Sequence, residues 1–362
     1  MHTQAPVGTD LDLAHVELHV EDLDAWRDVF TDRYGLRPAG VAGSAGQGFR
    51  SVALIGGRAV VVLTEALTDD HPCTAYVLSH GPGVADIAMR TADVDAVFAS
   101  AVAAGAPAVA EPHDGPDGVR TATIRAFGDV THTFLYGEPT TDAVLPPGFS
   151  PIPGAPGAAA PEPDNAPGLH TMDHFAVCVP NRSLDQTIDF YTTALGFQQT
   201  FEERIIVGSQ AMDSKVVQSR SGSVTFTILE PDVNCAPGQI DQFIKDHGGA
   251  GVQHIAFATD DIVHAVESMR HLGVEFLKTP GTYYDLLPNR FVPAGHPIAE
   301  LRAAGILVDE DHGGELFQLF TRSTHPRRTL FFEVIERAGA RLFGSNNIKA
   351  LYEAVELEQS GS

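Results

Sequence analysis

The 362-residue sequence predicts an α+β protein in which paired strand–helix–strand units curl their sheets around shared cavities. Internal similarity is the first observation behind this prediction, because residues 83–106 resemble residues 251–274 and residues 14–38 resemble residues 173–199. The second is the pattern inside these four segments. Each alternates polar and apolar residues, passes a polar turn, continues with helical periodicity and reaches a glycine. We therefore expect four repeated units that open with a strand and a helix.

Further strands are expected after these openings. The β-branched stretch 51–65 follows the opening of the first unit, and residues 216–231 follow that of the third. The fourth unit ends in the apolar run 329–339, which we interpret as its last strand. Between the second and third units, residues 139–168 are rich in proline, glycine and alanine and cannot sustain a helix or a central strand. We interpret them as a connector between domains at 1–138 and 169–362.

Composition limits the kind of partner. Lysine and arginine number 23 against 47 aspartates and glutamates, a net charge of −24, which argues against nucleic acids and anionic membranes. No apolar run is long enough to span a membrane, and the N-terminus lacks the basic and apolar regions of a secretion signal. The cysteines, Cys73, Cys178 and Cys235, are scattered, as in a reducing compartment. We expect a cytoplasmic protein, and a homo-oligomer is compatible with the sequence.

Three residues are candidates for a metal site. His174 opens the third unit, His254 opens the fourth, and Glu333 lies in the last strand, so they are about one unit apart. Glu333 is flanked by apolar residues, and a buried carboxylate costs several kcal/mol unless its charge is compensated. Two imidazoles and a carboxylate form the facial set of non-heme Fe(II) oxygenases, and zinc accepts the same ligands.

Ordinary structural roles are the alternative for each of these residues. Glu336, three positions after Glu333, should face the opposite side of the strand, and beside Arg337 it is expected to be solvated. His312 and His325 lie beside turn signals and are weaker ligand candidates.

The first half does not repeat the ligand set. His15 matches His174, but Asp86 stands in place of His254, and we expect Leu135 or Tyr136 in place of Glu333. The prediction is one metal site in the second half and a structural first half that holds no metal.

Longer motifs in the second half resemble a known family. They lie at residues 173–179, 238–257, 276–287, 309–321 and 331–356. On these motifs the chain resembles the 4-hydroxyphenylpyruvate dioxygenase family, and the first half is similar at 83–89 and 127–136. The resemblance implies the vicinal-oxygen-chelate fold, with four βαβββ units that form two open barrel-like domains. It also implies Fe(II) as cofactor, held by His174, His254 and Glu333.

The resemblance further implies a substrate pocket. Its catalytic residues would be Gln318, Ser214 and Gln253, and its substrate-binding residues would be Gln239, Thr227, Leu229, Ile348 and Phe343. Neutral amides suit this pocket because they bond a phenol and a carboxylate without adding charge. A helix over residues 346–359 is expected to close the pocket against water.

The implied substrates are 4-hydroxyphenylpyruvate and O₂. The α-keto acid can chelate Fe(II) through two oxygens and leave one position for O₂. Family members that attack the ring and form homogentisate have Asn and Phe where this chain has Leu229 and Ile348. These differences predict benzylic hydroxylation to 4-hydroxymandelate with release of CO₂, which supplies hydroxyphenylglycine for antibiotics.

Three alternatives remain open at this point. The nearest is formation of homogentisate from the same substrate. Another enzyme of this fold, such as an extradiol dioxygenase or a glyoxalase-like isomerase, is the second, and a non-catalytic binding protein is the third.

Overall fold

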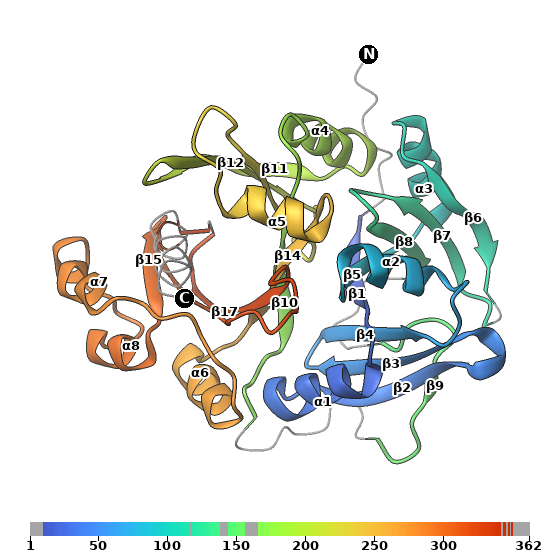
Figure 1. Cartoon of the computed structure of the whole chain (residues 1–362), viewed down its shortest axis with the longest axis horizontal. Helices are drawn as coiled ribbons and strands as arrows, with labels where there is room; N and C mark the ends of the chain where they lie inside the picture. Colours follow the sequence, from blue (N-terminus) through green and yellow to red (C-terminus); the bar gives the residue numbers. More distant parts are fainter. Residues whose placement is uncertain are drawn as a thin grey trace.

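The computed structural model describes residues 10–115, 117–137, 144–155, 166–341, 343, 344, 347 and 349. They form two curled sheets, one from each half of the chain, which lie side by side with β5 (Gly83–Thr91) against β14 (Gly251–Ala258) (Figure 1). The strand order is β6-β7-β8-β5-β1-β4-β3-β2-β9 in the first sheet and β11-β12-β13-β10-β14-β17-β16-β15 in the second. The two halves therefore have the same arrangement of strands around a central pair.

The first half contains two βαβββ units. The elements of the first unit are β1 (Asp12–His19), α1 (Leu23–Tyr34), β2 (Arg37–Ser44), the 3₁₀ turn η1 (Ala45–Gln47), β3 (Phe49–Gly56) and β4 (Ala59–Ala66). Helix α2 (Pro72–His80) leads to the second unit, which comprises β5, α3 (Val94–Ala103), β6 (Ala108–Asp114), β7 (Arg120–Arg125) and β8 (Thr131–Tyr136). A two-residue strand, β9 (Ser150–Pro151), pairs with β2 at the sheet edge, inside the segment interpreted as a connector.

The second half repeats this plan. Its third unit consists of β10 (Thr171–Cys178), α4 (Leu184–Ala194), β11 (Gln198–Val207), β12 (Gln210–Gln218) and β13 (Thr225–Pro231). Helix α5 (Gln239–His247) leads to β14, α6 (Ile262–His271), α7 (Gly281–Leu286), η2 (Leu287–Asn289), α8 (Ile298–Ala304), β15 (Leu307–Asp311), β16 (Gly314–Phe320) and β17 (Phe331–Ala338). In all four units the first strand runs parallel to the last, so the predicted fold class is confirmed.

Carboxylates fix the start of the helix in most units. Three helices follow aspartates whose side chains accept a hydrogen bond from a first-turn backbone N–H: Asp22, Asp93 and Asp261. A second carboxylate comes from the end of the unit's last strand. Glu65, Glu230 and Glu336 accept hydrogen bonds from backbone N–H groups at the starts of α1, α4 and α6. The expectation that Glu336 is solvated is wrong, because it caps α6 and also accepts from His296.

Each half carries the same two β-bulges in its central strand pair. In the β10–β14 ladder the extra residues are Asp173 and Gln253, and in the β1–β5 ladder they are Ala14 and Ala85. A bulge lets two successive side chains lie on one side of the strand, which simple alternation forbids. The ladders also place Asp86 at the position of His254, as the sequence predicts.

Comparison of the last strands of the two halves, β8 and β17, corrects one prediction. Glu333 lies two residues after the partner of His254 on β17, and Thr133 lies two residues after the partner of Asp86 on β8. Thr133 therefore occupies the position of Glu333, and the assignment of Leu135 or Tyr136 there is wrong. The loops that precede β8 and β17 differ in length. The sequence repeat alone therefore cannot align these two strands, and the strand pairing is needed to do so.

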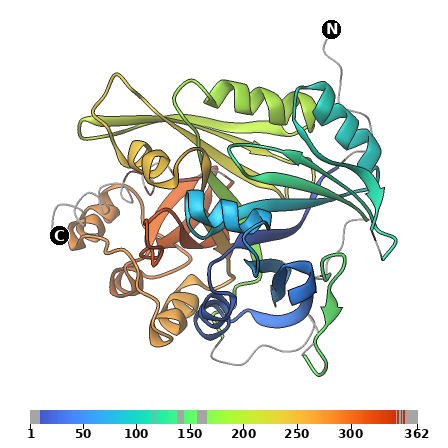
Figure 2. The same cartoon turned by 45° about the vertical axis from the view of Figure 1, so that its right-hand side comes forward.

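The halves meet through buried aromatic and polar groups. The ring of Phe226 on β13 packs against Phe127 and His132 of the first half and against Tyr191 of the second. The His132 Nε2 atom lies 2.7 Å from the Tyr191 hydroxyl. Helix α2 lies between the halves and contacts α5, where the Nδ1 atom of His80 is 2.7 Å from a backbone carbonyl (Figure 2).

Acidification is expected to destabilise this interface. Burial lowers the pKa of His132 and of His325 to about 4. These two histidines bind protons less readily in the folded chain than in the unfolded chain, so their contribution to stability is complete above pH 6.5 and is lost as the pH decreases toward 4. The lowered pKa of His132 alone should reduce the free energy of unfolding at pH 5 by about 2 kcal/mol relative to neutral pH. Urea unfolding at pH 7 and pH 5 measures this loss when the unchanged chain is compared with His132→Gln, and an equal change of midpoint in both chains would contradict it.

Candidate metal centre

Three ligand-type side chains converge on one face of the second sheet. His174 of β10, His254 of β14 and Glu333 of β17 offer ligand atoms that all lie within 4.8 Å of one another. The Nε2 atom of each histidine is 3.3 Å from Oε2 of Glu333. In the described part of the chain this is the only such group of three or more residues.

The cluster is buried and electrically coupled. Glu333 is only 1% exposed, and although burial raises its pKa, the two imidazoles outweigh that effect and lower the pKa to about 2. Burial also lowers the pKa of His174, but Glu333 and Asp173 reverse the shift and raise the pKa to about 9. His254 keeps a lowered pKa because burial dominates there. The carboxylate is therefore ionised, and its negative charge can be balanced either by a protonated His174 or by a metal cation bound among the three side chains.

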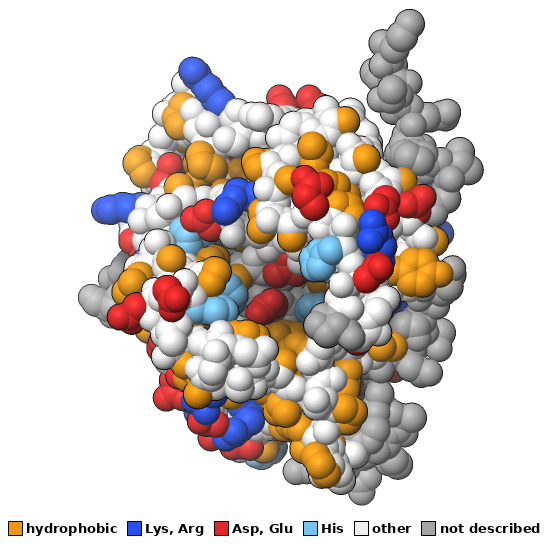
Figure 3. Space-filling model, turned by 90° about the vertical axis from the view of Figure 1, so that its right-hand side faces the viewer, with side chains coloured by type: hydrophobic (Ala, Val, Ile, Leu, Met, Phe, Trp, Pro, Cys, Tyr) orange, Lys and Arg blue, Asp and Glu red, His pale blue; other side chains and the backbone are white. Residues whose placement is uncertain are grey.

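The donor set fits a divalent metal ion. Two ring nitrogens and one carboxylate oxygen approach from one side, which leaves the opposite side for other ligands. The first half has no comparable set among its described residues. Its outer face is hollowed in the middle, with acidic side chains in the hollow (Figure 3).

Gln318 is placed against the cluster. Its Nε2 atom donates a hydrogen bond of 2.7 Å to Oε1 of Glu333, and its Oε1 atom accepts one of 2.9 Å from Asn347. Gln318 thus fixes the carboxylate through the oxygen that faces away from the histidines. The sequence did not indicate this role, nor that Asn347 supports it.

Apolar residues and one free hydroxyl form the wall next to His174. On β13, Thr227 and Leu229 lie opposite Ala176 and Cys178 of β10. Leu229 packs in the cluster that includes Phe243 of α5. The Thr227 hydroxyl is buried without a hydrogen-bond partner, so it can bond a bound molecule.

Ser214 and Phe343 lie near this wall. Ser214 is the cross-strand partner of Leu229 and is buried. The Phe343 ring lies 5.0 Å from the imidazole of His174, edge to face. Ile348 and most of the expected helix 346–359 lie outside the described residues. His312 is exposed and His325 bonds Thr329, and neither joins the cluster.

A cavity of about 830 Å³ lies beside His254, although His174, His254 and Glu333 are not among the residues that line it. Gln239 of α5, Gln253 and Phe331 line it, and the Phe331 ring stacks on His254 at 4.9 Å. Gln253 reaches this side because it is the bulged residue before His254. The predicted residues Gln239 and Gln253 therefore line one cavity, which approaches the metal centre through Phe331 and through Gln253, the neighbour of His254.

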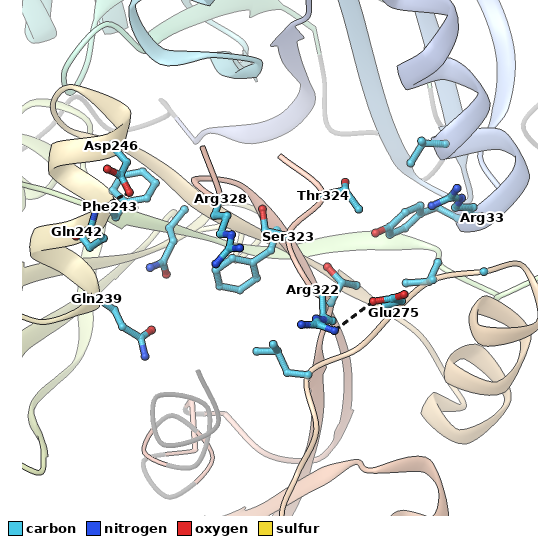
Figure 4. A pocket seen from close by; sticks show the side chains of 18 residues that line it. Arg33, Gln239, Gln242, Phe243, Asp246, Glu275, Arg322, Ser323, Thr324 and Arg328 are labelled. Carbon is cyan, nitrogen blue, oxygen red and sulfur yellow. Dashed lines mark hydrogen bonds and ion pairs between the residues drawn. The ribbon is translucent and has the colours of Figure 1, made fainter. Parts of the chain in front are cut away.

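Both halves of the chain contribute to this cavity. Arg33 and Tyr34 of α1 line it, and Figure 4 shows Arg33 on the side opposite α5, with the loop 321–330 between them. Arg322 in that loop forms an ion pair with Glu275 at 3.4 Å. The wall therefore carries charges of both signs, because Asp246 and Glu275 line it together with Arg33, Arg322 and Arg328. No helix in the described part of the chain has the length and apolar character needed to cross a membrane.

Comparison with known proteins gives consistent matches. Two family models described as the Glyoxalase/Bleomycin resistance protein/Dioxygenase superfamily match residues 14–123 and 171–319. The 4-hydroxyphenylpyruvate dioxygenase of Aspergillus fumigatus is 36% identical over 301 residues, which cover 79% of this chain and 73% of that protein. The enzyme of that name from Caenorhabditis elegans is 32% identical over 371 residues, 98% of this chain and 93% of that protein.

A solved structure matches over nearly the whole length. It is a triple mutant of 4-hydroxymandelate synthase from Streptomyces coelicolor, 42% identical, with a TM-score of 0.87. The match covers 97% of this chain and 99% of that one.

Proposed function

The chain belongs to the 4-hydroxyphenylpyruvate dioxygenase family, and from this premise we propose that it is an Fe(II)-dependent 4-hydroxymandelate synthase. It would convert 4-hydroxyphenylpyruvate and O₂ to 4-hydroxymandelate and CO₂ and serve the formation of hydroxyphenylglycine for antibiotics. One observation carries the proposal: a buried His174–His254–Glu333 cluster beside a cavity, in a chain similar throughout to a 4-hydroxymandelate synthase.

His174, His254 and Glu333 would hold the iron, which supplies a centre where the α-keto acid and O₂ meet. The protein's own groups bind and orient the substrate around it. The buried hydroxyl of Thr227 and the amides of Gln239 and Gln253 can bond its polar ends, while Phe331 adds an apolar surface beside His254. Gln318 keeps Glu333 in position through the 2.7 Å hydrogen bond.

The product depends on which carbon of the substrate lies nearest the reacting oxygen. A displacement of about 1 Å can change a rate on the order of 10²-fold, so a few wall residues suffice to decide. Leu229 presents an apolar side chain within the cluster under α5 and offers no hydrogen bond that would hold the ring for attack. Ile348 is proposed to act with it by leaving room for the substrate to rotate.

A product assay tests the proposal directly. Anaerobically prepared protein is loaded with Fe(II), mixed with 4-hydroxyphenylpyruvate and O₂, and the products are separated by chromatography. We expect 4-hydroxymandelate. Homogentisate as the main product would replace the proposal by the second candidate, which the names of the sequence relatives favour. Absence of O₂ consumption would refute both.

Leu229→Asn is expected to move the product ratio toward homogentisate by about tenfold, which corresponds to about 1.4 kcal/mol between two barriers. The amide would bring back a polar contact that can hold the ring near the metal. Leu229→Met, which keeps the wall apolar and similar in volume, is the control and should leave the ratio unchanged. An unaltered ratio in an active Leu229→Asn enzyme would exclude this position as a determinant.

A further inference from the structure

One of the two histidines at the metal centre is held by an ion pair from outside the ligand set. The Nδ1 atom of His174 lies 2.9 Å from Oδ1 of Asp173. Arg337 donates to both oxygens of that carboxylate, from Nε at 2.6 Å and from Nη2 at 2.8 Å. This two-bond arrangement is geometrically specific and fixes the plane of the carboxylate.

The contact determines which nitrogen of His174 is available. An ionised carboxylate only accepts hydrogen bonds, so Nδ1 carries a proton, and in the neutral imidazole, the form that binds a metal ion, Nε2 is the nitrogen that offers its lone pair. Nε2 is the atom that faces Glu333, at 3.3 Å. Asp173 therefore selects the tautomer that a metal ion needs.

Strand geometry brings the pair together across three strands. Asp173 is the bulged residue of β10, and the bulge allows its carboxylate to sit beside His174. Arg337 lies four residues after Glu333 on β17 and so projects from the same face. Strand β14 lies between β10 and β17, so the ion pair reaches across the strand that carries His254.

Phe343 contacts both Arg337 and the imidazole of His174. The Arg337 guanidinium lies over its ring at 5.0 Å, and the same ring meets the imidazole of His174 at 5.0 Å. Asp173, Arg337 and Phe343 thus enclose the imidazole on the side away from Glu333.

The first half provides an internal comparison. At positions equivalent to Asp173 and Arg337 it has Ala14 and Gly137, on a backbone with the same bulges. The equivalent histidine, His15, is buried with no hydrogen-bond partner at Nδ1. The fold therefore forms without the ion pair, and the pair occurs in the half that carries the ligand set.

We propose that Asp173 and Arg337 are positioning residues that hold His174 in the tautomer and orientation required for metal binding. This inference rests on the proposed metal centre. Outer partners of metal-bound histidines contribute about 10–100-fold to metal affinity. His254 differs, since its Nδ1 atom has no partner and its ring is held by stacking on Phe331.

Calorimetric titration of the metal-free full chain with Co(II) tests the proposal, together with thermal unfolding of the metal-free protein. Two double variants remove the charges of the pair together, so that neither charge is left unpaired. Asp173→Ala/Arg337→Gln deletes the acceptor and should weaken Co(II) binding by about 10–100-fold. Asp173→Asn/Arg337→Gln keeps an acceptor oxygen and should recover most of the affinity.

The matched control removes an ion pair of the first half. Arg50 and Glu65 lie 2.6 Å apart, and Arg50→Gln/Glu65→Gln should leave the Co(II) affinity unchanged. A purely structural role for Asp173 and Arg337 predicts lower unfolding temperatures with equal affinity in both double variants, and that result would overturn the proposal. If the unchanged chain binds no Co(II), the metal centre itself is wrong and the inference fails with it.

Discussion

Glu333→Gln is expected to lower turnover of 4-hydroxyphenylpyruvate by about 10³-fold or more, because losing the anionic ligand removes several kcal/mol of metal binding and activation. The amide has the same shape and can still accept the hydrogen bond from Gln318, so the strand should keep its place. Calorimetry should show loss of Co(II) or Fe(II) binding, while circular dichroism should show an unchanged fold.

Glu336 on the same strand is the control. Because its carboxylate is hydrogen-bonded in the structure, its substitution is expected to affect stability. Its carboxylate caps α6 by accepting from the N–H of Ile262 at 2.8 Å. Glu336→Gln should therefore cost about 1 kcal/mol of stability and leave metal binding intact. Parallel loss of metal in both variants would mean that Glu333 has no special role.

Phe226→Ala is expected to lower the free energy of unfolding by about 3–5 kcal/mol, the largest stability effect we predict. Phe226 is fully buried, and its ring also meets Phe175 and Phe197 besides the residues at the boundary between the halves. The cavity left by the ring cannot collapse, because its neighbours belong to two sheets. Urea unfolding followed by tryptophan fluorescence and circular dichroism measures the change.

Phe226→Leu refines this test, since it retains most of the apolar volume and should cost clearly less than the alanine variant. Phe226 faces the interface between the halves, whereas the metal ligands lie elsewhere on the sheet, so metal affinity of the folded fraction should stay constant in both variants. A cost below about 1 kcal/mol for Phe226→Ala would show that the halves do not depend on this cluster.

The sequence predicted the repeated architecture because strand alternation, helix periodicity and glycine stops are local signals. It also brought His174, His254 and Glu333 into one hypothesis, since units that repeat in sequence repeat in space. A buried-looking carboxylate in an apolar strand was the strongest single signal, and in the structure Glu333 lies between both imidazoles.

Contacts between segments that are far apart in the sequence could not be predicted from the sequence. The capping role of Glu336 depends on how closely β17 approaches the start of α6, and nothing near it in sequence reveals this contact. Thr133 was missed because a loop of different length precedes its strand. The link from Asp173 to Arg337 spans 164 positions, although the four-residue spacing from Glu333 to Arg337 could have suggested a shared face.

The paired bulges have a consequence for the ancestry of the chain. Both halves keep the extra residues at the same points of their central strands, yet only one half has the ligands. Such backbone irregularities are conserved within families and are costly to acquire independently. They indicate descent of both halves from one duplicated precursor, with the ligand set present in one of the two copies. Between the two halves of this chain, the backbone irregularities are therefore more alike than the side chains that could bind a metal.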